Sequence, residues 1–518
     1  MAGEGQVRGP DEGGTGGDSG GQGPTGTAEV GEETEPPSQD APGEESGCST
    51  SGYMEVRGVS ALRKESPDED PSWELGLQVE GKTAPWNAYK VSLVSVQDGK
   101  VIEPSHGGAF HAFNRVYQDM TPYIDIDEAY LDVYTGRVDI RLGIQKFAWG
   151  RLDEINPTDN LNPEDLTEGG TNDEVDRKIG VPALKVNAYS DAANVEVAFV
   201  PFYVPYRLPD REERWFPRVL VPPESVDAGA TVGRVPVRTY YRDIDLPPRT
   251  MRNAEAGIRV SRLVSGWDLS ASYFTGFDPM PLTESVVDVD VTLVNPLSLE
   301  YTAASRVTLM PALHRIHVFG FDFTGTLGDF TLRGEYAYFH GKRYNRRLES
   351  VLDELVTRET IDDMYSDFLV DYFASGGRTT SKSFRLDAEA VSKMDSMKYG
   401  FGVDYIHGDT SLSVQLIQEF VPDHDNARPV YFVKDGFDTL STFLLKQFFL
   451  QNTLELNLRV AYDLEFHDHL VKPSARYHFT DRLQGTVGAI VIGGGRKDSL
   501  LGQFGMNDQV YAQLRCSF

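Results

Sequence analysis

Apolar and polar residues alternate one by one along many short segments of the chain. In residues 453–464, Leu, Val and Tyr side chains share one side of an extended backbone, while Glu455, Asn457 and Arg459 fall on the other. Residues 73–80 and 138–144 follow the same rule. A period of two is typical of a β-strand that has one apolar and one polar face. The pattern therefore predicts an all-β chain.

These segments come in pairs with connections of two kinds. Short connections lie at 135–137, 190–194, 264–266, 325–329, 450–452 and 480–482, and long ones at 149–180, 204–252, 277–312 and 341–383. We expect roughly 16 to 18 strands of about 10–12 residues, close to the length that crosses a bilayer when tilted. Short turns, long loops and apolar-out, polar-in strands predict a transmembrane antiparallel up-and-down β-barrel. A soluble β-sandwich does not need this asymmetry of connections.

Residues 1–50 have a different composition. They are rich in Gly, Pro, Ser, Thr and Glu, and they contain 11 acidic residues, one arginine and no aromatic residue. Such a segment cannot bury enough apolar surface to fold alone, so we predict a disordered acidic tail over 1–50 and a barrel over 51–518. The tail is either a spacer or a contact for a periplasmic partner. The opening MAGEGQVRGP lacks the basic and apolar regions of a signal peptide, so the leader of an exported chain is not visible in it.

Charge and cysteine content exclude several classes of protein. The chain carries 49 basic and 79 acidic residues, a net charge of −30, which argues against nucleic acid as a partner. No run of about 18 apolar residues occurs, so no transmembrane helix is expected. Two cysteines, Cys48 and Cys516, exclude a disulfide-rich scaffold. A bond between them is conceivable because first and last strands of a closed barrel are neighbours, although Cys516 is in phase with lipid-facing residues.

The last nine residues, VYAQLRCSF, form one more alternating segment that ends on Phe518. An amphipathic terminal strand closing on an aromatic residue resembles the signal that outer-membrane barrels present to their assembly machinery. The resemblance implies the barrel-assembly machinery and outer-membrane lipid as partners, and the outer membrane of a Gram-negative bacterium as location.

The most patterned connection is IQKFAWGRLDEINPTDNLNPEDL, residues 144–166. If Leu142 and Ile144 face lipid, alternation turns Trp149 into the lumen. Two Asn-Pro steps then favour defined turns, because proline fixes φ and restricts the residue before it. We interpret the loop as folded inward to narrow a pore; alternatively it caps an external loop. The residues expected to line the pore or its constriction are Arg141, Gln145, Phe147, Trp149, Arg151, Asp153, Asp159, Asp165, Arg259, Arg333, Arg459 and Arg476.

The stretch LGIQKFAWGRLDEINPTDNLNPEDL also resembles the G-x-Q-x-x-x-W-G … N-P-x-D … N-P-x-D-L signature of a large, poorly characterised family of proteobacterial outer-membrane barrel proteins. That family is usually grouped with porin-like proteins, and it implies no settled substrate. The motif positions are Gly143, Gln145, Trp149, Gly150, Asn156, Pro157, Asp159, Asn162, Pro163 and Leu166.

Other candidate chemistry is weak. The pairs His314/His317 and His467/His469 lack a third ligand, so no metal site is expected. No G-x-S-x-G elbow, P-loop or H-E-x-x-H motif occurs, and we expect neither a catalytic residue, a cofactor nor an enzyme. Residues 346–373 have helical spacing within a long loop, which suggests a plug, a docking helix or a helix packed over the barrel mouth.

The sequence thus favours an outer-membrane, porin-like channel for passive diffusion of small hydrophilic solutes or ions. Inward charges of both signs leave the ion preference open. The alternative is a structural barrel that sheathes or anchors a partner complex for electron transfer or export.

Overall fold

The computed structural model describes residues 47–63, 71–97, 123–171, 174–209, 213–229, 232–242, 244, 246–278, 280–494, 496 and 499–518. Most of the acidic tail expected over 1–50 lies outside these residues. The first strand, β1, already begins at Cys48, so strand structure starts slightly before the expected boundary at residue 51.

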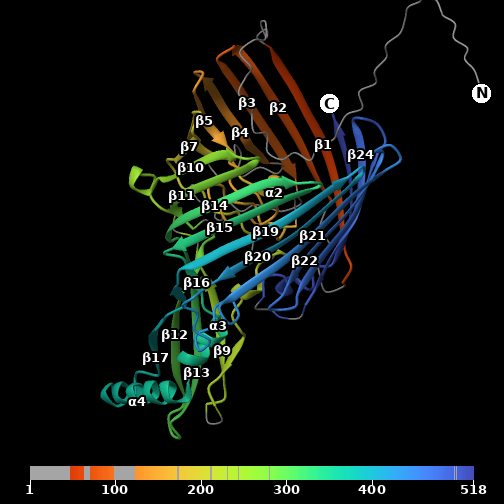
Figure 1. Ribbon diagram of the computed structural model, residues 1–518. Helices are drawn as coiled ribbons and strands as arrows, with labels where there is room; N and C mark the ends of the chain where they lie inside the picture. Colours follow the sequence, from red (N-terminus) through yellow and green to blue (C-terminus); the bar gives the residue numbers. More distant parts are fainter. Residues whose placement is uncertain are drawn as a thin grey trace, which may run out of the picture. The chain divides into compact units, whose positions relative to one another are not determined.

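Eighteen strands form a closed antiparallel β-barrel (Figure 1). Each strand pairs with the next along the ring, and the last pairs with the first, so the ring has no free edge. The number agrees with the upper end of the expectation from sequence. In ring order the strands are β1 (Cys48–Ala61), β2 (Ser72–Ala84), β3 (Asn87–Gln97), β4 (Tyr123–Tyr134), β5 (Val138–Gln145), β6 (Val181–Tyr189), β7 (Asn194–Val200), β10 (Glu255–Val264), β11 (Trp267–Phe277), β14 (Arg315–Leu327), β15 (Phe330–His340), β19 (Ser396–His407), β20 (Thr410–Phe420), β21 (Phe437–Phe449), β22 (Leu454–Asp463), β23 (His469–His478), β24 (Leu483–Gly493) and β25 (Gln509–Ser517).

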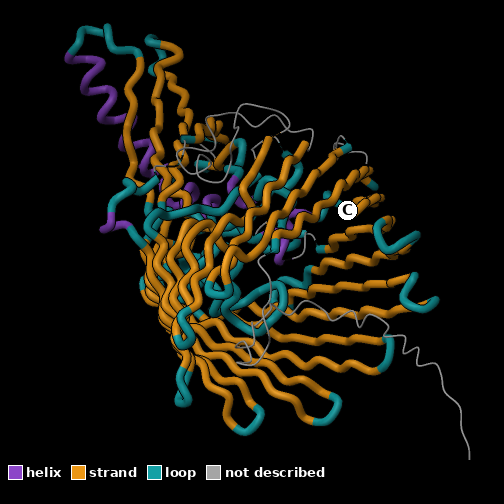
Figure 2. Tube along the Cα trace, turned by 90° about the horizontal axis from the view of Figure 1, so that it is seen from above, coloured by secondary structure: helices purple, strands orange, loops and turns teal. Residues whose placement is uncertain are grey.

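The two kinds of connection sit at opposite rims of the barrel. Because β25 ends beside the start of β1, short turns such as those at 135–137 and 265–266 share the rim of the chain end. The long connections share the other rim, and the turns can be followed as teal segments in Figure 2. The asymmetry expected from sequence is confirmed.

Side-chain exposure follows the alternation along strands such as β20 and β25. Leu142, Val487 and Leu514 expose 62%, 59% and 50% of their surface on the outer side. Inward positions carry polar groups, and Asp322 and Glu335 are 1% and 4% exposed. An apolar exterior around a charged interior is the reverse of a soluble barrel.

The closing strand pair separates the two cysteines. Cys516 lies opposite Met54, whereas Cys48 lies opposite Gly81 on β2, six residues away along β1. At about 3.3 Å per residue this amounts to about 20 Å, too far for a disulfide. Both cysteines are free, so the bond that was conceivable from the sequence is not formed.

A second sheet of five strands was not expected. It grows from three long connections of the barrel, which were interpreted as loops within a single barrel over 51–518. Its β12–β13 hairpin pairs antiparallel, and β13 pairs parallel with β9. The order is β17 (Ser381–Ala388), β12 (Leu282–Asn295), β13 (Glu300–Ala312), β9 (Arg234–Tyr241) and β8 (Ser225–Asp227).

Two helices cover one face of this second sheet, α3 (Leu348–Leu355) and α4 (Arg358–Ala374). Thr357 caps α4, because its hydroxyl accepts the backbone N–H of Thr360 at 3.2 Å. Leu352 and Phe368 are fully buried against Val287 and its neighbours on the sheet. The helical expectation is confirmed, but these helices pack on the second sheet and not in the barrel. The apolar side chains of α3 and α4 thus pack on the second sheet and not on the strands of the barrel.

Short elements complete the described chain: α2 (Glu174–Arg177), β16 (Arg343–Asn345) paired with β18 (Val391–Lys393), and the 3₁₀ turns η2 (Arg218–Leu220), η3 (Met251–Asn253) and η4 (Gly502–Phe504). Among the residues placed by the structure, no helix combines the length and apolarity needed to cross a membrane.

Candidate functional site

The connection between β5 and β6 is an enclosed loop. Every residue from 150 to 171 is buried or half-buried, although the segment consists mainly of turns and bends. Connecting segments usually lie at the surface because water satisfies their backbone polar groups. Here side chains of the barrel wall take that role, as the contacts below show. We call residues 150–171 the inner loop.

The entrance of the inner loop packs against one side of the wall. Phe147, Trp149 and Leu161 are each at most 3% exposed and form one apolar cluster with side chains of β6, β7, β11, β14 and β15. The indole Nε1 of Trp149 donates to Glu196 Oε1 on β7 at 2.6 Å. These aromatic rings therefore fasten the loop to the wall and are themselves shielded from water.

One wall carboxylate accepts several donors from the inner loop. Glu335 on β15 accepts the backbone N–H groups of Arg151 and Leu152 through Oε1, the latter at 2.6 Å. Its Oε2 accepts the backbone N–H of Thr158 at 3.1 Å and the Thr158 hydroxyl at 2.9 Å. A buried carboxylate needs such compensation for the water that it has lost.

Ion pairs join the same part of the loop to further strands. Arg151 pairs with Asp268 on β11 and, at 3.3 Å, with Asp322 on β14. Asp322 also contacts Arg259 on β10 at 3.1 Å. Asp153 of the loop pairs with Arg333 on β15 at 2.7 Å. Charged hydrogen bonds of this kind fix geometry strongly when partly buried.

The far part of the loop contacts the opposite arc of the ring. Glu154 pairs with Arg459 on β22 at 2.8 Å, and Glu168 pairs with Arg57 on β1. Lys472 on β23 donates to the carbonyl oxygen of Thr171 at 2.7 Å. The inner loop therefore touches strands from both arcs of the barrel and spans its interior.

Polar side chains within the connection hold its two ends together. Asn162 Nδ2 donates to the carbonyl oxygen of Ile179 at 2.8 Å, while its Oδ1 accepts the N–H of Phe147 at 2.6 Å. Asp159 pairs with Lys178 at 2.8 Å and also accepts the N–H of Trp149 at 3.2 Å. Asn162 and Asp159, both motif positions, thus link the two ends of the connection through hydrogen bonds and an ion pair.

Arg177, just beyond the loop, contacts both Glu164 and Glu154, at 3.2 and 3.1 Å. Burial by itself lowers the pKa of Arg177, but the two carboxylates raise the pKa overall. Its charge is therefore stable inside the connection. Arg177 is the last residue of the short helix α2, in a segment that the sequence predicted to be a loop.

The remaining expected site residues make separate contacts, within the inner loop or on the barrel wall. Arg141 pairs with Asp132 on β4 at 2.7 Å, and Arg476 approaches Glu455 on β22 at 3.5 Å. Gln145 is fully buried and donates to the carbonyl oxygen of Ala183 at 2.9 Å. Asp165 pairs with Arg207 at 2.6 Å.

The other motif residues serve the backbone of the connection. Gly143 has φ +141°, and a Cβ there would lie 2.1 Å from the carbonyl oxygen of Ala129. Pro157 and Pro163 are buried, and the carbonyl oxygen of Asn156 accepts the N–H of Asp159 at 3.1 Å. The N–H of Leu166 donates to the carbonyl oxygen of Arg207 at 2.8 Å.

Several contacts of the site were absent from the expected set. Asp322 could have been found, since it alternates between Phe321 and Phe323 and must face inward. The role of Trp215 had no such signal. This residue is 2% exposed, lies against Gly169 and packs with side chains of β24 and β25. The connection between β7 and β10, interpreted as an external loop, thus also reaches the inner loop.

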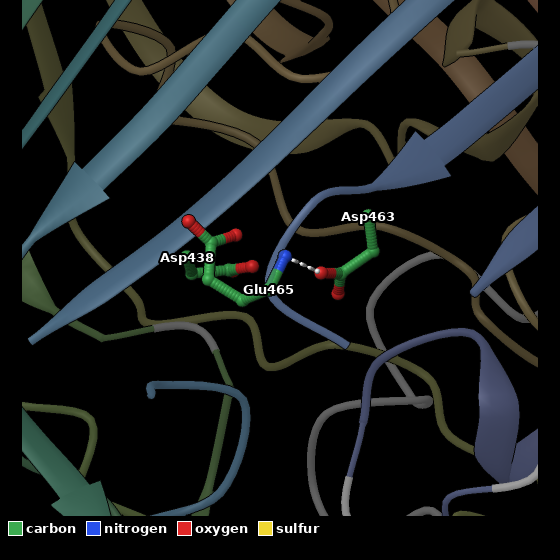
Figure 3. Close-up of side chains that lie close together, drawn as sticks. All are labelled: Asp438, Asp463 and Glu465. Carbon is green, nitrogen blue, oxygen red and sulfur yellow. Dashed lines mark hydrogen bonds between the residues drawn. The ribbon is translucent and has the colours of Figure 1, made fainter. Parts of the chain in front are cut away.

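Three carboxylates meet at the rim of the long connections: Asp438, Asp463 and Glu465 (Figure 3). Asp463 Oδ1 accepts the N–H of Glu465 at 2.9 Å, and Glu465 accepts both the N–H and the hydroxyl of Thr439. These bonds tie the turn after β22 to β21. They account for the position of two carboxylates without an ion.

Near the rim of the chain end lies a cavity of about 540 Å³. Its lining carries charges of both signs from β2, β3 and β4. The charged and aromatic lining residues are Glu80, Lys82, Tyr89, Lys90, Tyr130 and Asp132.

Comparison with known proteins finds distant structural likenesses and no relative by sequence. No family model matches the chain, and no curated protein matches it by sequence. Among solved structures, Acinetobacter baumannii OccAB4 is 10% identical, with a TM-score of 0.42, over 90% of this chain and 97% of that one. OmpT, an outer membrane protein of Vibrio cholerae, gives 10% and 0.37 over 91% and 99%. A mutant of Rh. blastica porin gives 12% and 0.35 over 91% and 100%.

Two of these similar structures are named as a porin and as an outer membrane protein. With TM-scores below 0.5, the likenesses do not carry the function of those proteins to this chain. The family resemblance of residues 142–166 stays a resemblance.

Proposed function

We propose that the protein is a porin-like channel of the bacterial outer membrane, through which small hydrophilic solutes or ions diffuse passively. The apolar exterior fits outer-membrane lipid, and the charged interior fits water and dissolved ions. Phe518, at the end of the closing strand, would present the chain to the barrel-assembly machinery. The acidic tail would face the periplasm, where it can contact a partner.

The observation that carries the proposal is the inner loop, which spans the interior and contacts charged side chains on both arcs of the ring. A charged constriction is how a wide barrel selects among small solutes. Residues Arg151, Asp153, Asp159, Arg333 and Arg459 would set its charge. Gln145, Phe147 and Trp149, expected as pore-lining residues, would instead hold the loop in place.

The test is single-channel conductance of the purified, refolded barrel in a planar bilayer, with reversal potentials under a salt gradient. Wild-type protein should give discrete steps, and deletion of residues 151–166 should enlarge them. The sign of the reversal potential reports whether carboxylates or arginines control passage. A folded barrel that stays silent, with and without the deletion, would overturn the proposal.

A second candidate is a scaffold barrel that sheathes or anchors a partner complex for electron transfer or export. The observation in its favour is the second sheet with α3 and α4, which adds a folded surface at the rim of the long connections. A partner that co-purifies in stoichiometric amount, combined with a silent barrel, would favour this function.

A further inference from the structure

The inner loop makes a small concave site for an anion. Gly150 has φ +98°, a conformation favourable for glycine, and the backbone N–H groups of Arg151 and Leu152 that follow point to the same carboxylate oxygen. Successive N–H groups arranged in this way form a nest that binds anions. The occupant here belongs to the same chain, namely Glu335 of β15.

Both partners are shaped for this contact. A Cβ atom on Gly150 would lie 2.8 Å from Glu335 Oε1 and 3.0 Å from the Thr158 hydroxyl oxygen. A Cβ on Gly320, on the neighbouring strand β14, would lie 2.9 Å from Thr158 Cγ2. A side chain at Gly150 would crowd the carboxylate of Glu335, and one at Gly320 would crowd both Ser272 Oγ, at 2.3 Å, and Thr158. Both glycines therefore leave room for the contact between the loop and the wall.

Glu335 holds the inner loop at three backbone N–H groups, those of Arg151, Leu152 and Thr158. Its donors are mainly backbone groups, which are fixed by the course of the chain, and Thr158 adds one hydroxyl. Arg333 contacts the loop backbone at one carbonyl oxygen, that of Arg151 at 2.7 Å, and otherwise binds the flexible side chain of Asp153, while Arg459 binds that of Glu154. An anchor on the backbone sets where the loop lies, whereas an ion pair between long side chains leaves it some freedom.

We propose that Glu335 is the positioning residue of the inner loop and thereby sets the width of the passage. This inference rests on the proposed channel function and goes further, since it assigns the position of the constriction to one carboxylate on the wall. Glu335 need not touch the solute. It acts through Arg151, Leu152 and Thr158.

Two substitutions test the anchor from its two sides. Glu335→Gln replaces one carboxylate oxygen by an amide nitrogen, which donates and cannot accept, so either the Arg151 and Leu152 donors or the Thr158 donors lose their acceptor. Gly150→Ala leaves the wall intact and brings a Cβ against the carboxylate. The matched control is Glu455→Gln, which alters another inward carboxylate, 5% exposed, that contacts Asn457 on its own strand at 2.8 Å and Arg476 on β23 at 3.5 Å.

Two readouts are needed: one that does not depend on conduction, and the conductance itself. Leu161→Cys, in a Cys48→Ser and Cys516→Ser background, places a thiol in the buried apolar cluster of the loop. A small water-soluble thiol reagent labels this cysteine when the loop moves away from the wall. We expect both anchor variants to raise the labelling rate roughly 10- to 100-fold, which corresponds to the free energy of one hydrogen bond to a charged acceptor. Single-channel steps should become larger and noisier.

The outcomes separate the two proposals. Labelling and conductance at the wild-type level in folded Glu335→Gln and Gly150→Ala would overturn the anchor and leave the channel intact. An equal effect of Glu455→Gln would also overturn it, because any buried carboxylate would then suffice. If labelling rises in the anchor variants while no variant conducts, the anchor stands and the channel function fails.

Discussion

Trp149 occupies space that Gly257 leaves free: a Cβ atom on Gly257 of β10 would lie 2.5 Å from the Cη2 atom of the Trp149 ring. The barrel wall thus lacks a side chain at the point where Trp149, just before the inner loop, packs against it. A glycine within a strand often marks such a close approach of another group. This relationship gives the first prediction.

Gly257→Val should displace Trp149 and weaken its hydrogen bond to Glu196. Overpacking of this kind costs about 1–3 kcal/mol, and the barrel should still close. We expect larger channel steps and a lower heat-unfolding temperature in detergent. The control is Gly58→Val on β1, where a Cβ would meet nothing within 4 Å. Equal behaviour of both variants would contradict the prediction.

Cys48 and Cys516 should stay unpaired under oxidising conditions. The register of β1 places them too far apart for a disulfide, and both side chains are exposed. Intact mass after alkylation should therefore show two modified thiols without prior reduction. Modification that requires a reductant would show that the closing register is wrong.

Asp395, between β18 and β19, should contribute to stability in a defined pH range. Burial alone would raise the pKa of Asp395, but hydrogen bonds from Gly341 N–H, the Tyr338 hydroxyl and His340 lower it to about 2. Because the folded-state pKa lies below the ordinary value of 3.8, this carboxylate stabilises the fold above about pH 4, and the contribution is lost as pH falls through about 2.

Asp395→Asn should therefore lower the unfolding temperature at pH 6 and leave it unchanged near pH 2. Thermal unfolding of the two proteins across this range measures the difference. The exposed Asp387→Asn on β17 serves as control. A gap between wild type and Asp395→Asn that persists at pH 2 would rule out the carboxylate as its cause.

Phe368→Ala should loosen the second sheet without opening the barrel. The side chain is fully buried against the sheet, and loss of a core phenylalanine costs about 3–5 kcal/mol. We expect proteolytic cleavage within 346–374 while the barrel keeps its heat-resistant mobility on a gel. Val370→Ala on the same helix, where the side chain is 65% exposed, should resist cleavage as wild type does.

Much of the inner loop could be inferred from the sequence. Alternation along 138–144 turned Trp149 inward, and the Asn-Pro steps indicated fixed turns. Charge type was visible too, since Asp153 and Arg333 were both expected at the site. Their pairing was not, because the two residues lie far apart in the chain and alternation says nothing about which strands become neighbours. Alternation along β15 makes Glu335 an inward carboxylate, but no local pattern makes it the acceptor of the loop backbone.

The second sheet shows the same limit. Val287, Val289 and Val291 alternate with Asp288 and Asp290 as regularly as any barrel strand, so the local pattern contained strands there. No local feature of the sequence indicates that these strands leave the barrel. That outcome depends on a parallel pairing with β9 and on the apolar stripes of α3 and α4, which cover one face.

The sequence by itself determined the strands of the barrel, their two faces, the rim of short turns and the rim of long connections, because each depends on neighbouring residues and on a period of two. The tertiary structure alone decided the closure at 18 strands, the separate sheet and the contacts that carry the inner loop across the interior. These depend on hydrogen bonds and ion pairs between distant segments, and only the folded chain brings those segments together.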